Sequence, residues 1–402
     1  MIKIGIIREG KVPPDKRVPL TPEQCAEARD SFNLSVAVQP SPVRCFTDEQ
    51  YAALGIPLQE DLGDCDILLG VKEVPVDMLI PGKTYLFFSH TIKKQPYNRK
   101  LLQAVLEKGI SLVDYEVLTD EKGVRLIAFG FYAGVVGAHN ALWTWGQRTG
   151  DFTLPRLHEC HDYAEALEAY KTLLLPPLRI VLTGGGRVSS GAVKNLLDMG
   201  IRQVSPSEFL EQDFSEAVFT QIHAADYAER KDGSLFEKSH FYAHGDEYRS
   251  KFAPFYRKAD IFINGIYYDQ KGPAFFTAEE TARDDFHIRV IGDITCDIMP
   301  DSSVPCTIRP CKIADPVYGF SRTTGQETAP YTPDSIDVMA IDNLPSELPR
   351  DASAFFGRQL LDNVLGALIQ GGDNPVIRRG KITENGHLAP LFSYLEDYAA
   401  GS

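Results

Sequence analysis

The chain has 402 residues, a formal net charge of -14 at pH 7, 44% hydrophobic residues and 24% charged residues. This length suits two domains, and the composition is that of a globular protein. The acidic balance argues against nucleic-acid and membrane partners, and no apolar run reaches the length of a transmembrane helix.

The N-terminal residues and the cysteines indicate a cytoplasmic protein. Residues 1–7 are apolar, but Arg8 and Glu9 follow at once, so this run predicts a first strand rather than a signal peptide. The seven cysteines include no C-x-x-C pair, and nothing near Cys306 and Cys311 completes a zinc set. We therefore expect reduced thiols and no bound metal.

Short apolar runs alternate with helical patterns over the first third of the chain. Strands are expected at residues 3–7, 35–39, 66–69, 84–88 and 111–114, and helices at 22–30, 47–54 and 95–108. Strand–helix alternation predicts a mainly parallel α/β sheet. The Gly/Ala-rich stretch 128–148, which holds both tryptophans, predicts a buried helix that connects two lobes. Helical spacing then continues over the polar residues 151–177.

The segment 178–192 is the most informative part of the chain. An apolar strand leads into Gly184, Gly185 and Gly186, and a helical pattern follows. A strand, a glycine turn and a helix N-terminus form the site at which a Rossmann fold binds the pyrophosphate of a dinucleotide. Ser189 stands at the usual third glycine position, with Gly191 two residues later. The alternative is a structural glycine turn in a sheet that binds no ligand.

The choice of nicotinamide cofactor depends on the residue that ends the second strand of such a unit. An Asp or Glu about 20 residues after the first glycine binds the ribose 2′-hydroxyl of NAD. Here the expected strand ends on Ser205, and Arg187 lies in the glycine loop. Together with Ser207, these residues suit a 2′-phosphate and favour NADP(H). The alternative is that Glu208 or a backbone group serves NAD(H).

Three further strands are expected at residues 260–266, 288–294 and 336–341, with helices after Pro345 that return to the first lobe. Ligands bind at the carboxyl edge of an open α/β sheet.

Polar residues of the first third lie at such an edge. Lys72 and His90 follow the strands 66–69 and 84–88. A lysine and a histidine can share proton transfer at an amine or a carbonyl, provided that the lysine pKa is depressed. Arg17 suits bidentate binding of a carboxylate. Taken without further motifs, the residue types alone favour an ordinary surface or hydrogen-bonded polar position for each of them.

Several motifs resemble the alanine dehydrogenase and saccharopine dehydrogenase superfamily. They are Arg17 in its Arg-Val-Pro-Leu-Thr-Pro setting and the segments 70–75, 88–95 and 128–134. The segments 263–267, 292–297 and 341–349 favour the lysine-forming saccharopine dehydrogenases, which include the lysine–ketoglutarate reductase part of the animal bifunctional enzyme.

The resemblance implies an α/β fold of two Rossmann-like domains with parallel sheets and an interdomain cleft. Residues 1–130 with 346–402 would form the substrate domain, and residues 131–345 the dinucleotide domain. It also implies interconversion of saccharopine with L-lysine and 2-oxoglutarate, using NAD(P)(H). The alternatives are alanine dehydrogenase, another opine-type enzyme such as N5-carboxyethylornithine synthase, and a non-catalytic NADPH-binding protein.

The family motifs also assign roles to residues of this chain. Lys72 and His90 would be the acid–base catalysts, and Arg17, Glu73, Lys93 and Glu116 would bind the substrate. The expected cofactor-binding residues are Gly184, Gly186, Arg187, Val188, Ser205, Ile266, Tyr267 and Asp342, the last of which would contact the nicotinamide ribose.

Overall fold

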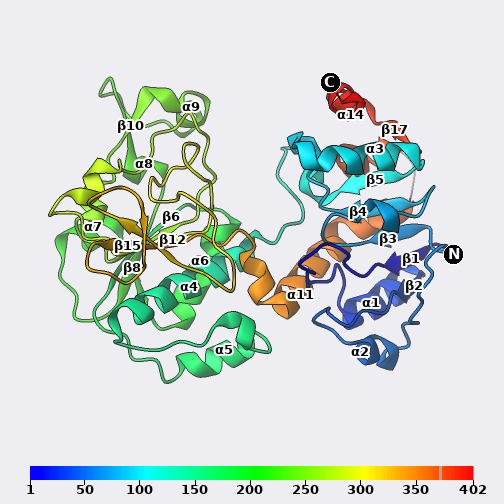
Figure 1. The fold of residues 1–402 in the computed structure, drawn as a ribbon, viewed down its shortest axis with the longest axis horizontal. Helices are drawn as coiled ribbons and strands as arrows, with labels where there is room; N and C mark the ends of the chain where they lie inside the picture. Colours follow the sequence, from blue (N-terminus) through cyan, green and yellow to red (C-terminus); the bar gives the residue numbers. More distant parts are fainter. Residues whose placement is uncertain (371–373, 402) are drawn as a thin grey trace. The chain divides into compact units, whose positions relative to one another are not determined.

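The computed structural model describes residues 1–370 and 374–401. The chain forms two compact units (Figure 1): unit 1 is Met1–Phe129 with Pro349–Ser402, and unit 2 is Gly130–Leu348. Their bounds differ by a few residues from the expected domains. The expected cleft between two domains stays a prediction.

Unit 1 is built on a five-stranded parallel sheet in the order β2-β1-β3-β4-β5. The strands are β1 (Lys3–Ile6), β2 (Ser35–Val38), β3 (Ile67–Leu69), β4 (Thr84–Phe87) and β5 (Ser111–Asp114). The helices are α1 (Pro22–Phe32), α2 (Asp48–Ala53), α3 (Arg99–Glu107), α11 (Pro349–Leu360), α12 (Gly366–Gln370), α13 (Pro375–Gly380) and α14 (Glu396–Ala400), and β16 (Thr383–Glu384) pairs with β17 (His387–Leu388). The parallel α/β sheet predicted for the first third is therefore confirmed.

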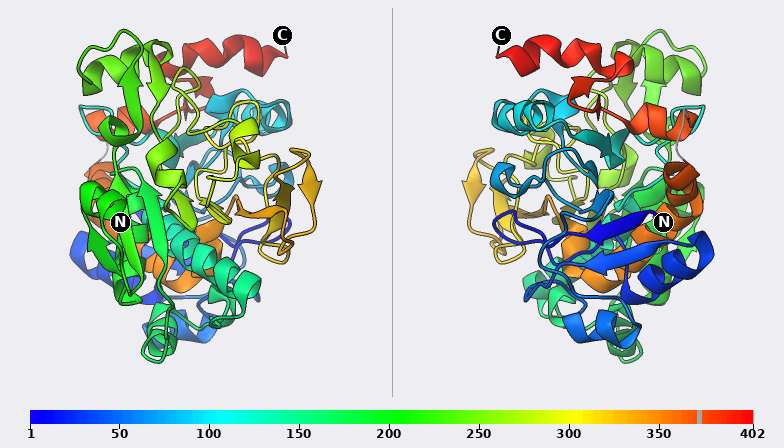
Figure 2. Two further views of the ribbon diagram at one scale, coloured as in Figure 1. Left: turned by 90° about the vertical axis from the view of Figure 1, so that its left-hand side faces the viewer. Right: turned by 90° about the vertical axis from the view of Figure 1, so that its right-hand side faces the viewer.

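Successive residues along each strand point to opposite faces of this sheet. The buried apolar residues therefore form two cores, one on each face. Ile4 and Leu86 belong to the core that α1 and α11 cover, whereas Leu68 and Tyr85 belong to the core that α3 covers. The C-terminal helix α14 packs against α3 on this second face (Figures 1 and 2). Both faces are covered, which leaves the strand ends as the exposed part of the sheet.

In two of the segments predicted to be helical, the α-helix is shorter than expected. Pro96–Asn98 form a separate 3-10 turn, so α3 starts only at Arg99. The residue before a proline is driven to extended backbone, and Gln95 has that conformation. In the region 151–177 only α5 (Tyr163–Tyr170) is an α-helix.

Unit 2 is built on an eight-stranded sheet in the order β14-β13-β15-β12-β11-β6-β8-β7. The strands are β6 (Arg179–Thr183), β7 (Arg202–Val204), β8 (Val218–Ile222), β11 (Ile261–Asn264), β12 (Val290–Asp293), β13 (Tyr318–Ser321), β14 (Glu327–Thr328) and β15 (Ser335–Met339). Its helices include α4 (Gly130–Thr149), α6 (Arg187–Asp198), α7 (Pro206–Glu211) and α10 (Ala253–Tyr256).

Two expectations for this sheet are wrong. The sheet is not parallel throughout, because β13 runs antiparallel to β15 and β14 antiparallel to β13. Antiparallel strands need only a short turn, which the sequence did not reveal. The second expectation took the strand that ends at Ser205 as the second strand of the Rossmann unit, which pairs with the first. The strands that pair with β6 are β11 and β8, and β7 lies beyond β8 at the edge of the sheet.

A small excursion follows β8. Helix α8 (Ala224–Tyr227), the antiparallel pair β9 (Ala228–Arg230) and β10 (Tyr248–Ser250), and helix α9 (Lys238–Ala243) make it up. The sequence did not predict this segment.

Helices α4 and α6 approach each other closely at two glycines. A Cβ atom on Gly134 would lie 1.8 Å from the Val188 carbonyl oxygen, and one on Gly191 would lie 1.8 Å from the Phe131 carbonyl oxygen. No side chain fits at either position. Gly191 thus allows close packing of helices, although it lies two residues beyond the usual third glycine.

We expect Gly134→Ala to destabilise unit 2 by about 3 kcal/mol, because α4 and α6 must separate to admit the methyl group. Both tryptophans, Trp143 and Trp145, lie on α4, so their fluorescence during urea unfolding reports this change. The matched control is Gly186→Ala, since no atom lies within 4 Å of the added Cβ. It should cost less than about 1 kcal/mol. Equal losses for the two variants would contradict the close-packing argument.

Candidate functional site

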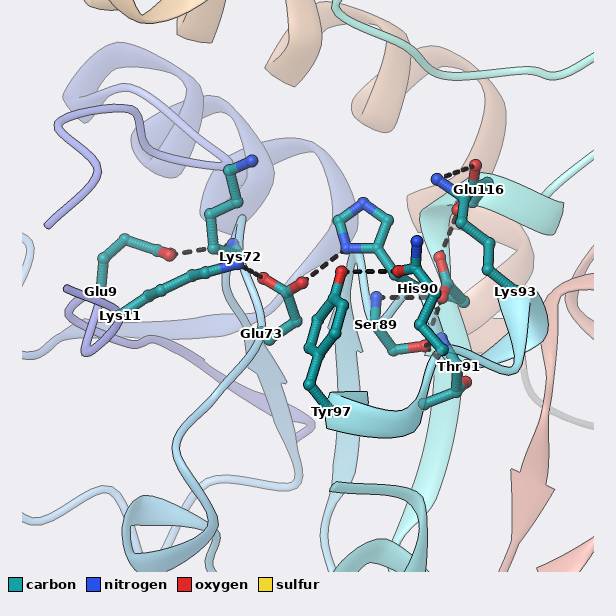
Figure 3. A network of polar contacts seen from close by, with 12 residues as sticks. Glu9, Lys11, Lys72, Glu73, Ser89, His90, Thr91, Lys93, Tyr97 and Glu116 are labelled. Carbon is teal, nitrogen blue, oxygen red and sulfur yellow. Dashed lines mark hydrogen bonds and ion pairs between the residues drawn. The ribbon is translucent and has the colours of Figure 1, made fainter. Parts of the chain in front are cut away.

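A polar cluster lies at the carboxyl ends of the strands of unit 1 (Figure 3). Glu9, just after β1, accepts hydrogen bonds from the backbone N–H groups of Val71 (2.7 Å) and Lys72 (2.9 Å). The Glu9 carboxylate thus ties the loop after β1 to the loop after β3. Burial raises the pKa of Glu9 to about 7, although both N–H groups favour its charged form. Glu9 was not among the site residues predicted from the sequence.

Lys72 is the first candidate catalyst of this cluster. Burial and the nearby Arg17 guanidinium lower the pKa of its amine, against the opposing effect of Asp15 and Glu73. A lowered pKa makes more of the neutral amine available near pH 7, which is what a general base requires.

His90, the second candidate catalyst, is held by Glu73. The His90 Nδ1 atom lies 2.6 Å from Glu73 Oε1, and Lys11 Nζ lies 2.7 Å from Glu73 Oε2. Burial alone would raise the pKa of Glu73, but the hydrogen bonds from His90 and Lys11 lower it to about 2. An ionised carboxylate only accepts, so Nδ1 carries the hydrogen and Nε2 is left for proton exchange.

The backbone also fixes where His90 points. Its φ of +54° lies in the left-handed region, which turns the chain sharply after β4. Figure 3 shows the His90 ring and the Lys72 amine on the same side of the Glu73 carboxylate. Because β3 and β4 are paired strands, the two candidate catalysts follow neighbouring strands of one sheet.

We expect Glu73→Gln to remove a pH-dependent part of the stability of unit 1. The folded-state pKa of Glu73 is about 2, below its ordinary value of 4.5. Its contribution is therefore present above pH 4.5 and is lost as the pH falls toward 2. The shift corresponds to about 3 kcal/mol at neutral pH. Circular dichroism of urea unfolding at pH 3, 5 and 7 should show the difference between the two proteins falling to about half of its neutral-pH value at pH 3. A difference that does not change with pH would contradict this result.

Arg17 is buried in unit 1 and paired with Asp15. Its Nε and Nη2 atoms lie 3.0 and 2.7 Å from the two carboxylate oxygens, and its backbone N–H donates to Asp15 Oδ1 at 2.9 Å. The guanidinium carbon also lies 4.2 Å from the centre of the Phe129 ring. Burial would raise the pKa of Asp15, but Arg17 lowers it to about 2. Asp15 thus fixes the orientation of Arg17, whose role in binding a substrate stays a prediction.

Glu116 lies next to two cations. Lys93 Nζ and Arg125 Nη2 each lie 3.3 Å from Glu116 Oε1, whereas Oε2 is buried without a hydrogen-bond partner among the described residues. Asp114, the last residue of β5, accepts hydrogen bonds from the backbone N–H groups of Ser89 (2.9 Å) and Glu116 (2.7 Å). Burial raises the pKa of Asp114. Asp114 therefore has a structural role: it joins the loops that carry His90 and Glu116.

The glycine loop of unit 2 forms a cradle at the end of β6. Gly184 has a φ of +101°, and a Cβ there would lie 2.5 Å from Ser189 Oγ. A Cβ on Gly185 would lie 2.9 Å from the His223 ring, whereas Gly186 has open space. The Ser189 hydroxyl donates to the carbonyl oxygens of Thr183 (3.1 Å) and Gly265 (3.3 Å). Ser189 thereby anchors the first turn of α6 to β6 and to the end of β11.

A cavity of about 880 Å³ opens beside this cradle. Its walls come from the glycine loop, from α8 and α9, and from the loop after β11, and they include the expected residues Gly184, Gly186, Ile266 and Tyr267. Such a volume suits part of a dinucleotide. The glycine cradle and the helix N-terminus beside it fit a bound pyrophosphate.

The other expected cofactor residues lie in different settings. Arg187 and Val188 begin α6. Asp342 is exposed and follows β15. Ser205 caps α7, where its hydroxyl accepts from the Glu208 N–H, and it lies at the end of the edge strand β7. The residue that follows β8, the neighbour of β6 on the side of β7, is His223. It was not among the predicted residues because the strand that ends at Ser205 was taken as that neighbour.

The chain thus has two α/β units, one with a glycine cradle at the end of β6 and one with a cluster of charged side chains at its strand ends. Residues 5–136 match the family model described as alanine dehydrogenase/PNT, N-terminal domain. The solved structure of an L-alanine dehydrogenase has the same fold, with a TM-score of 0.67 and 16% identity over 99% of this chain and all of that chain. The α/β class is thereby confirmed.

Two curated relatives identify the family. A saccharopine dehydrogenase [NAD(+), L-lysine-forming] of Emericella nidulans is 30% identical over 388 residues, which cover 90% of this chain and 91% of the relative. The alpha-aminoadipic semialdehyde synthase of Arabidopsis thaliana is 30% identical over 98% of this chain, which spans only 41% of that relative. The chain belongs to the family of the L-lysine-forming saccharopine dehydrogenases. This confirms the resemblance seen in the sequence motifs.

Two features are absent from the residues that the structure describes. Within residues 1–370 and 374–401, no helix is long and apolar enough to cross a bilayer. Across the same residues, no group of three or more His, Cys, Asp or Glu side chains is placed to hold a metal ion.

Proposed function

We propose that this protein interconverts saccharopine with L-lysine and 2-oxoglutarate, using a nicotinamide dinucleotide. The observation that carries the proposal is that Lys72, whose pKa is lowered, and His90, whose Nδ1 is engaged by Glu73, follow neighbouring strands of one sheet. This arrangement suits two proton transfers at a carbon–nitrogen bond. The name of the Emericella relative supports saccharopine and lysine as the reactants.

The reaction joins the lysine ε-amine to the keto carbon of 2-oxoglutarate, loses water to form an imine, and reduces that imine to the secondary amine of saccharopine. The bound dinucleotide supplies or accepts the hydride. Lys72 would give or take the proton of the secondary amine. His90 Nε2 would move protons during the addition and loss of water. Each group of this kind contributes about 10²- to 10⁴-fold.

The charged residues around these two would bind the substrate. Arg17 would bind a carboxylate of the dicarboxylic part, because a guanidinium suits bidentate contact with carboxylates. Glu73, Lys93 and Glu116 would line the same site, as the family motifs imply. In unit 2, the glycine loop and Asp342 would bind the pyrophosphate and a ribose.

We propose NADP(H) rather than NAD(H) as the cofactor of this chain. The support is that the strand beside β6 is followed by His223 rather than by an acidic residue. Arg187 at the start of α6 adds a cation to the glycine loop. The fungal relatives are named as NAD(+) enzymes, so the cofactor would differ between them and this chain.

The oxidation of NADH and of NADPH, each followed by absorbance, tests these proposals. Each cofactor is combined with lysine plus 2-oxoglutarate and, separately, with ammonia plus pyruvate. We expect oxidation that requires both lysine and 2-oxoglutarate and that is faster with NADPH. Oxidation only with ammonia and pyruvate would indicate alanine dehydrogenase activity. Cofactor binding without oxidation by either pair would indicate a non-catalytic protein.

A further inference from the structure

The residues that surround His223 point to a phosphate on the cofactor ribose. In a Rossmann unit, one strand pairs with the first strand on the side of the adenosine ribose. The residue that follows this strand faces that ribose. His223 occupies this position, is exposed, and lies against Gly185 of the phosphate cradle. Asp226 is the next carboxylate along the chain, and it accepts the backbone N–H of His223 at 2.8 Å. That contact directs Asp226 to the first turn of α8.

Two lysines line the same cavity as His223. Lys238 begins α9 and Lys271 lies in the loop after β11, and both are exposed. Neither forms an ion pair with any part of the chain that the structure describes. The lining includes one carboxylate, that of Asp269, against these two lysines. The excess of positive charge suits an anionic ligand group.

The two lysine-bearing segments are held together by backbone packing. A Cβ on Gly245, which follows α9, would lie 2.8 Å from the Gly272 nitrogen. Within the loop after β11, the Tyr268 hydroxyl donates to the Gly272 carbonyl oxygen at 2.9 Å. The excursion after β8 and the loop after β11 therefore form one continuous wall of the cavity.

The rest of this wall is aromatic. Tyr227, Phe236, Phe241 and Tyr242 line the cavity, and the ring centres of Phe236 and Phe241 lie 5.5 Å apart. Aromatic faces suit the stacking of a purine ring. A purine surface, a phosphate cradle and two unpaired lysines thus border a single cavity.

We propose that this cavity binds the 2′-phosphorylated adenosine half of NADP(H), with His223, Lys238 and Lys271 as the residues that recognise the 2′-phosphate. This inference rests on the proposed use of a nicotinamide dinucleotide. It adds the particular residues that select between its two forms, and it assigns a function to the excursion between β8 and β10.

Calorimetric titration of the complete chain with three nucleotides tests the proposal without any turnover. The probes are adenosine 2′,5′-bisphosphate, adenosine 3′,5′-bisphosphate and 5′-AMP. We expect the 2′,5′-bisphosphate to bind at least tenfold more tightly than the other two. Equal affinities, or tighter binding of the 3′,5′-bisphosphate, would overturn the proposal.

Variants then locate the phosphate contacts. Lys238→Ala and Lys271→Ala should each weaken 2′,5′-bisphosphate binding about tenfold and leave 5′-AMP binding within twofold, which also shows that the variant is folded. His223→Asp should reduce the difference between the affinity for adenosine 2′,5′-bisphosphate and the affinity for 5′-AMP. The matched control is Lys258→Ala, an exposed lysine that follows α10, and it should change neither affinity. If these variants lose affinity for the 2′,5′-bisphosphate and for 5′-AMP to the same extent, or for neither nucleotide, the assignment of these residues is overturned.

The two proposals fail separately. A 2′,5′-bisphosphate preference without oxidation in the presence of lysine and 2-oxoglutarate would overturn only the proposed reaction. Turnover that is equally fast with NADH and NADPH, combined with equal nucleotide affinities, would overturn only the 2′-phosphate site.

Discussion

We expect Lys72→Met to lower kcat by about 10²- to 10⁴-fold, the usual contribution of a general acid–base group. Methionine has a similar length but cannot exchange a proton. The fold should be retained, because the substitution removes a half-buried cation that is repelled by Arg17. Cofactor binding should be unchanged, since the glycine loop belongs to unit 2. Steady-state kinetics with saccharopine, together with nucleotide titration, measure both quantities.

The control for this prediction is Lys83→Met, the same substitution at the amino end of β4. It lies at the edge of the sheet opposite to the one that carries the candidate catalysts, so its kcat should stay within about twofold of that of the native protein. If Lys72→Met retains kcat as well, Lys72 is not the proton-transfer group. If both variants lose it, the loss comes from a disturbed sheet rather than from missing chemistry.

The first unit could be predicted from sequence because its strands and helices alternate simply. Each strand is a short, almost fully buried apolar run, and Lys72 and His90 lie where such runs end. The pairings within the cluster could not be predicted in the same way. The contact of Glu9 with the loop after β3 joins residues 63 positions apart, and no local pattern encodes it. The position of Glu9 just beyond β1 was the only available signal.

The second unit shows why strand order is harder to read than strand position. We expected the second strand of the Rossmann unit to be the first apolar run after the helix, and this placed Ser205 at the ribose. The chain instead passes through the edge strand β7 and returns to insert β8 next to β6. The run Val218–Ile222 was visible as a buried strand, and using it would have selected His223.

The second large effect is expected from the buried pair of Asp15 and Arg17. Asp15→Asn should destabilise unit 1 by about 3–5 kcal/mol, because it leaves the Arg17 charge without its bidentate partner. Tryptophan fluorescence would miss this change, since both tryptophans lie in unit 2. Hydrogen exchange of the backbone amides of β1 and β3 measures it, and the fluorescence then serves as an internal control for unit 2.

A double-mutant cycle separates the charge effect from the loss of packing. Arg17→Met alone also leaves a buried charge, that of Asp15, whereas Asp15→Asn combined with Arg17→Met leaves none. The double variant should therefore be more stable than the sum of the two single losses implies, by about 1–3 kcal/mol. Additive losses would mean that the ion pair is not coupled in solution.

Arg17→Lys keeps the charge but loses the planar fork. We therefore expect the rise in KM for saccharopine, expressed as a free energy, to exceed the loss in the free energy of unfolding. If its KM is unchanged, Arg17 supports the fold of unit 1 and does not bind the substrate carboxylate.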